Sequence, residues 1–173
     1  LAATGELVVE KSGVLNLGVE GMMIIGAVTG FIAGVTTGSP VAGFAFAALC
    51  GAGVALIFGG LTQVLRSNQV ATGLALTLFG LGLAALLGQG YAGIKPPSTT
   101  RLDIPGISDL PIVGPLLFSF DWVVYASLLL VVAVWAFLNR TRAGLVLRAV
   151  GENHDAAHAL GYKVVRIRLL AIA

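Results

Sequence analysis

Three long stretches of this sequence contain no Asp, Glu, Lys or Arg, and they constrain the fold more than any other feature. They cover residues 21–65, 67–94 and 122–139. Each reaches or exceeds the roughly 18 residues that can cross a bilayer as a helix. Charged residues make up 10% of the chain, whereas a soluble domain usually carries about a quarter. We therefore expect a membrane protein.

The uninterrupted apolar stretches predict helices rather than the strands of a barrel, which would show alternating segments of about ten residues. The first stretch is too long for one helix, and its TTGSP segment at 36–40 is a turn signal. We expect an all-α polytopic helix bundle with about four full spans, at 19–35, 41–61, 70–87 and 122–138. The chain starts without methionine and stops inside an apolar run, so it is interpreted as part of a single transmembrane domain that covers 1–173.

The polar connections predict the orientation of the spans. Residues 88–121 hold five of the six prolines, which excludes a continuous membrane helix, and we expect an external loop there. Residues 139–168 hold six Lys and Arg, against two in the proline-rich loop. Because cytoplasmic loops are enriched in these residues, 139–168 is expected to be cytoplasmic, with Arg66 on the same side.

Glycines 26, 30, 34 and 38 recur at every fourth position. On a membrane helix, such a strip lets another backbone approach closely. The strip fits a tight bundle that can rock or slide, and ordinary helix packing is the alternative, so the strip does not identify a function.

Two short motifs are candidates for chemical sites. GQGYAG at 88–93 matches a dinucleotide-binding pattern, but it follows a membrane helix instead of a strand, so the match is interpreted as accidental. HDAAH puts His154 and His158 on one helix face, as in zinc metalloproteases, with Asp155 where the general base usually stands. The chain has no third histidine, and two surface histidines on a solvated helix face are the alternative.

The segment 148–168 is polar and basic beside one of the most apolar runs. A short helix is expected at about 153–160, with Asn153 as its N-cap and Gly161 in the left-handed conformation after its end. We expect Ala156, Ala159 and Leu160 to face the protein, while Glu152, Asp155 and His158 face water. The residues alone fit an amphipathic connector at the headgroups or a docking element for a cytoplasmic partner equally well.

Polar side chains within or beside the spans are candidates for lining a substrate pathway, because they are costly in lipid. They are Asn16, Glu20, Asn68, Gln69, Thr72 and Thr77. The glycines of SGVLNLGVEG can interrupt a helix near the midplane, and transporters often build sites from interrupted helices. The alternative is that Asn68 and Gln69 cap a helix and Glu20 pairs with Lys11 or reaches the interface.

Three blocks of the sequence resemble the permeases of bacterial ABC importers for simple sugars and nucleosides, a group related to ribose and branched-chain amino acid permeases. The blocks are GELVVEKSGVLNLGVEGMMIIGA (5–27), GLALTLFGLGL (73–83) and RTRAGLVLRAVGENHDAAHALGYKVVRIRLLA (140–171). They stand in the family's order and, with IPGISDLPIVGPLLF between them, cover nearly the whole chain. His154 departs from the family, which often has proline there.

The resemblance implies a type II importer permease in the bacterial cytoplasmic membrane, a transport subunit and not an enzyme. Its expected partners are a second permease subunit, cytoplasmic ATPase subunits, an external substrate-binding lipoprotein and membrane lipid, with no nucleic acid. No cofactor and no metal is expected on this chain, since ATP and magnesium would belong to the ATPase. The family's coupling helix matches Arg148, Glu152, Asn153, Asp155 and Gly161. A membrane zinc metalloprotease using His154 and His158, or an ion-coupled secondary transporter, remains the alternative.

Overall fold

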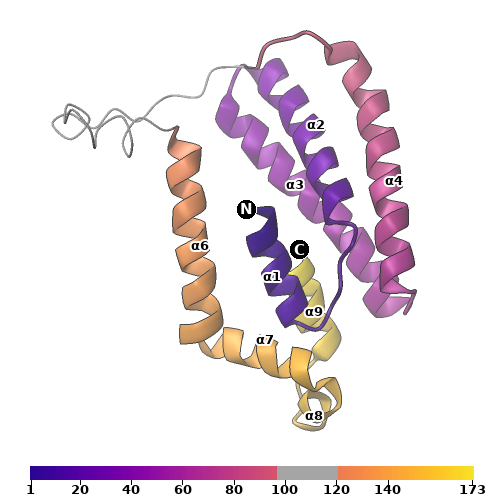
Figure 1. Cartoon of the computed structure of the whole chain (residues 1–173), viewed down its shortest axis with the longest axis vertical. Coiled ribbons are helices and arrows are strands. Elements are labelled where there is room, and N and C mark those ends of the chain that lie inside the picture. Colours follow the sequence, from indigo (N-terminus) through magenta and orange to yellow (C-terminus); the bar gives the residue numbers. More distant parts are fainter. Residues whose placement is uncertain (97–120) are drawn as a thin grey trace, which may run out of the picture.

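The computed structural model describes residues 1–96 and 121–173, and the regular elements in these two ranges are helices. The all-α prediction is confirmed (Figure 1). In chain order the elements are α1 (Ala2–Lys11), α2 (Val19–Thr37), α3 (Pro40–Gly59), the π-helical turn η1 (Gly60–Val64), α4 (Gln69–Gly88), the 3-10 turn η2 (Gln89–Tyr91), α6 (Trp122–Arg140), α7 (Arg142–Glu152), α8 (His154–Ala159) and α9 (Val164–Ile172).

Four of these helical segments are long and apolar enough to cross a membrane. They are Val19–Thr37, Pro40–Val64, Gln69–Tyr91 and Trp122–Arg140, and each contains one of the four spans expected from the sequence. The second is longer than expected because η1 continues α3 as far as Val64. Residues 97–120, the greater part of the expected external loop, lie outside the described residues.

The conformation of the turn between α2 and α3 is explained by its residue types. Gly38 ends α2 in the left-handed conformation, with φ +66°. Ser39 is the N-cap of α3, and Pro40 occupies the first helical position, where its missing N–H costs nothing. Gly38 therefore terminates the helix instead of extending the strip formed by Gly26, Gly30 and Gly34, which corrects the expectation of a four-glycine strip.

Glycines bring α2 into backbone contact with both of its neighbours. A Cβ atom at Gly30 would lie 2.8 Å from the carbonyl oxygen of Gly43 on α3. On the α4 side, a Cβ atom at Gly21 would lie 2.7 Å from the Cα atom of Thr77. Contacts of this kind are typical of membrane helices that pack through small residues. They hold α2, α3 and α4 together as one layer.

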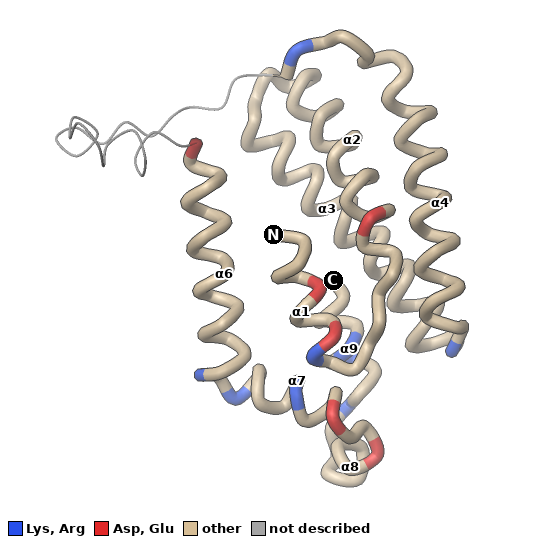
Figure 2. Tube along the Cα trace, in the orientation of Figure 1, with Lys and Arg blue, Asp and Glu red and all other residues tan. Residues whose placement is uncertain are grey.

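Helices α6 and α7 border α1 and α9 on two sides (Figure 1). Helix α6 and helix α4 lie on opposite sides of these two short helices. From the end of α6, α7 runs beneath them toward α8 (Figure 1). The sharp corner between α6 and α7 is formed by Thr141, whose hydroxyl accepts a hydrogen bond from the Gly144 N–H at 3.0 Å. Lys and Arg gather at the end of the molecule that carries α7 and α8, opposite the α2–α3 turn (Figure 2).

Candidate functional site

Residues 12–18 connect α1 to α2 without helical structure, and the chain reverses its direction there (Figure 1). We call this segment the 12–18 break. Its polar side chains are buried, with Ser12 at 0% and Asn16 at 4% exposure. The Asn16 Oδ1 accepts a hydrogen bond from the Gly18 N–H at 3.0 Å, and its Nδ2 donates to the Met22 sulfur at 3.6 Å. The Asn16 amide therefore stabilises the break itself.

The 12–18 break packs against the first turns of α4. The Leu15 N–H donates to Gln69 Oε1 at 2.8 Å, and the Thr77 hydroxyl donates to the Leu17 carbonyl at 3.1 Å. Between these two hydrogen bonds, a Cβ atom at Gly73 would lie 2.8 Å from the Gly18 nitrogen. The structure thus places Gln69 and Thr77 of α4 against the backbone on either side of Asn16.

The other three candidates for the pathway lie differently. Asn68 is exposed and caps α4, accepting a hydrogen bond from the Ala71 N–H at 3.1 Å, as the alternative interpretation expected. The Thr72 hydroxyl is 2.8 Å from the Ser67 hydroxyl. Glu20 is exposed in the first turn of α2, where the positive end of the helix dipole favours a carboxylate.

The sequence interpretation missed Glu6, which faces the break from α1. Its Oε1 accepts a hydrogen bond from the Asn16 N–H at 3.3 Å, while its Oε2 is buried and has no hydrogen-bond partner among the described residues. Burial raises the pKa of the Glu6 carboxyl, although the Asn16 N–H partly offsets this effect. The residues around Glu6 in the sequence did not indicate its role, because its contact with Asn16 depends on how the chain turns after α1.

Helices α7, α8 and α9 form a hairpin at the cation-rich end, which we call the α7–α8–α9 hairpin (residues 142–172). Asn153 caps α8 by accepting a hydrogen bond from the Ala156 N–H at 3.0 Å, and Gly161 follows the helix with φ +88°. Both features are those expected from the residue types. Two residues from the neighbouring helices, Val150 at 0% and Val164 at 7% exposure, enclose Ala157.

The expectation for which face of α8 is buried was wrong. Ala157 is the buried residue of this helix, whereas Ala156, Ala159 and Leu160 are exposed, Leu160 at 77%. The face is set by the positions of Val150 and Val164 rather than by the hydrophobicity of α8 itself. As a result, Ala156, Ala159 and the C-cap Leu160 point away from the protein beside the exposed polar residues of α8.

The remaining residues matched to the coupling helix lie in the same hairpin. Glu152 and Asp155 are exposed. Arg148 is half-buried, and its Nε has no hydrogen-bond partner among the described residues. His154 Nε2 lies 3.1 Å from Asp155 Oδ1, and in the described part of the chain no three His, Cys, Asp or Glu residues form a group that could hold a metal ion.

The hairpin also touches the 12–18 break directly. A Cβ atom at Gly151, near the end of α7, would collide with the Lys11 carbonyl and lie 3.0 Å from the Gly13 nitrogen. Gly13 itself adopts φ +81°, which favours glycine. The hairpin and the break are therefore in backbone contact.

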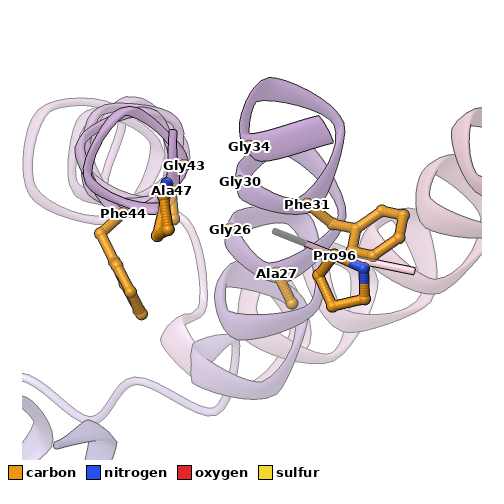
Figure 3. A pocket seen from close by; sticks show the side chains of 10 residues that line it. Gly26, Ala27, Gly30, Phe31, Gly34, Gly43, Phe44, Ala47 and Pro96 are labelled. Atoms are coloured by element: carbon orange, nitrogen blue, oxygen red, sulfur yellow. The ribbon is translucent and has the colours of Figure 1, made fainter. Parts of the chain in front are cut away.

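A separate cleft of about 440 Å³ lies between α2 and α3 and is closed on one side by Pro96. Figure 3 shows Gly26, Gly30 and Gly34 of α2 turned toward Gly43 and Ala47 of α3. Its lining consists of Gly, Ala, Phe and Pro. These side chains offer no hydrogen bonds to a polar ligand, so the candidate site remains the surroundings of the break.

The chain matches, over residues 1–173, the family described as "Branched-chain amino acid transport system / permease component". It is 40% identical to the "Putative glucose ABC transporter permease protein" of Haloferax volcanii, over 99% of this chain and 54% of the relative. It is 31% identical to the guanosine ABC transporter permease protein of Bacillus subtilis, over 99% of this chain and 58% of the relative.

A third relative is the nucleoside ABC transporter permease protein of Lactococcus lactis, 30% identical over 92% of this chain and 54% of the relative. The chain thus spans little more than half the length of these curated relatives. No solved structure matches it.

Proposed function

Because the chain belongs to the family of branched-chain amino acid transport system permease components, a family of multi-pass proteins of the cytoplasmic membrane, we propose that it is the membrane-spanning permease subunit of an ATP-driven importer. The cargo is a simple sugar or a nucleoside. The named relatives support both classes, since one is named for glucose, one for guanosine and one for nucleosides.

The observation that carries this proposal is the geometry of α8. The helix stands out from the cation-rich end of the molecule (Figures 1 and 2). It is held to its own protein by Ala157 and exposes Leu160 at 77%. A short helix of six residues is stable only when docked, and an exposed leucine beside it suits a groove on a cytoplasmic partner. In this proposal the groove belongs to an ATPase subunit, which binds ATP and magnesium.

The rest of the assembly follows from the same proposal. A second permease subunit packs against this one, and an external lipoprotein delivers the cargo. The chain performs no chemistry and needs no cofactor of its own. The cargo passes near the 12–18 break, where Gln69 and Thr77 bond the backbone on either side of Asn16. Amides and hydroxyls are suitable partners for sugar hydroxyls and for a nucleobase.

The direct test is uptake by proteoliposomes that contain the importer assembled with its ATPase and binding protein. We expect accumulation of labelled glucose or labelled guanosine that requires ATP on the ATPase side of the membrane and is abolished by a hydrolysis-deficient ATPase. Uptake driven by a proton or sodium gradient without ATP would contradict the proposal. Stoichiometric zinc in the purified protein would instead favour the metalloprotease alternative.

Replacing Gly161 by valine should separate ATP hydrolysis from uptake. Gly161 has φ +88°, and no heavy atom lies within 4 Å of a Cβ placed there, so the effect comes from the backbone alone. A β-branched residue is strained in this conformation, whereas asparagine tolerates it. We expect Gly161→Val to retain ATP hydrolysis and lose most uptake, with Gly161→Asn near wild type. Equal uptake in both variants would show that this turn does not orient α8.

A further inference from the structure

Arg168, on α9, joins two segments that are distant from it in the sequence. Its Nε donates a hydrogen bond to the Ser12 carbonyl at 3.1 Å, and its Nη1 donates to Gln63 Oε1 at 3.4 Å. Ser12 is the C-cap of α1 and begins the 12–18 break. Gln63 belongs to η1, the π-helical turn that ends the α3 span. One guanidinium therefore joins the end of α1, η1 and α9.

The position of the Arg168 guanidinium is fixed by geometry as well as by charge. A Cβ atom at Gly13 would lie 3.0 Å from Arg168 Nη2, so the guanidinium lies directly over the left-handed turn of the break. The planar fork of an arginine can donate to two acceptors in fixed directions, whereas a lysine ammonium is a single point of charge. Arg168 also stands at the negative end of the α1 dipole.

The same arginine is connected to α8 through packing. Helix α9 begins at Val164, which encloses Ala157 of α8 together with Val150 of α7, and Ile167 packs against this cluster. Arg168 is the next residue after Ile167. The break in turn donates from the Leu15 N–H to Gln69 of α4. A continuous series of contacts thus runs from α8 through Arg168 to the candidate pathway.

We propose that Arg168 is the positioning residue through which a displacement of α8 reaches the 12–18 break and η1, and so couples ATP hydrolysis to opening of the cargo pathway. This inference rests on the proposed function, because it assumes that α8 is moved by an ATPase. In this inference Arg168 transmits the displacement of α8 and does not contact the cargo.

The test measures uptake and ATP hydrolysis together in proteoliposomes containing the assembled importer, with labelled glucose and labelled guanosine as probes. We expect Arg168→Lys to lower the ratio of cargo transported to ATP hydrolysed by about tenfold, within the usual range of coupling between sites. Arg166→Ala is the matched control, since Arg166 is exposed on the same helix and should leave the ratio unchanged.

The Arg168→Lys variant keeps the positive charge, so it distinguishes the positioning role of Arg168 from simple stabilisation of the α1 C-terminus. If Arg168 only stabilised the helix end, Arg168→Lys would keep the positive charge there and preserve the ratio, which would overturn the inference. Gln63→Leu provides a second route, because it removes the other acceptor and leaves Arg168 intact. We expect it to lower the ratio as well, and the double variant should lower it no further than Arg168→Lys alone.

Additive effects in the double variant would show that the two residues act separately, and would also overturn the inference. A wild-type importer without ATP-dependent uptake would contradict the proposed function itself. A wild-type importer with normal uptake and an Arg168→Lys variant with an unchanged ratio would contradict only the role of Arg168.

Discussion

Gly80→Val is expected to lower the free energy of unfolding by about 3 kcal/mol, at the upper end of the usual cost of overpacking. A Cβ atom at Gly80 would lie 2.7 Å from the Gly21 carbonyl oxygen and 2.8 Å from its Cα atom. Both are backbone atoms of α2, so no side-chain rearrangement can make room. Helices α2 and α4 would have to separate, which should appear as a lower thermal unfolding midpoint in detergent.

The matched control for this variant lies on the same helix. No heavy atom lies within 4 Å of a Cβ atom placed on Gly82, so Gly82→Val meets open space. Both variants carry the same change in helix propensity, and the difference between their unfolding midpoints therefore reports the α2–α4 contact. Equal midpoints for the two variants would mean that the close approach of Gly21 and Gly80 does not exist in the membrane protein.

Gly151→Val is expected to reduce uptake to background. A Cβ atom at Gly151 would collide with the Lys11 carbonyl, which forms part of the last turn of α1. The end of α7 would then be forced off the 12–18 break, and the hairpin would lose one of the contacts by which it holds α1. ATP-dependent uptake in proteoliposomes is the measurement, with ATP hydrolysis recorded in the same samples.

The control for this variant is Ala149→Val, which adds similar bulk on the exposed face of the same helix and should leave uptake intact. If Gly151→Val transports as well as Ala149→Val, the contact between α7 and the break has no part in transport. Loss of uptake in both variants would point instead to a general intolerance of α7 to larger side chains.

Much of the fold could be predicted from local patterns. The four spans follow from long windows without charge, and the α2–α3 turn follows from Gly38, Ser39 and Pro40. The start and end of α8 follow from Asn153 and Gly161 in the same way. Each of these features depends on the conformational preference of a residue or on the cost of charge in lipid, and both can be evaluated without knowing the neighbours.

The parts that could not be predicted depend on contacts between distant segments. Arg168 and Ser12 are separated by most of the chain, and no periodicity links them. The buried face of α8 is decided by Val150 and Val164, which lie on other helices. The placement of Gln69 and Thr77 against the backbone on either side of Asn16 required the positions of α1 and α4. For these residues, the polar character indicated a role but did not identify the partners.

The glycine contacts of α2 limit how this protein can move. Because α2 approaches the backbones of both α3 and α4 closely, sliding α2 past either of them would force atoms into overlap. The three helices should therefore travel as a rigid body, and flexing should concentrate at hinges outside them. The non-helical residues after Lys11 and the corner at Thr141 are two described positions that can serve as such pivots.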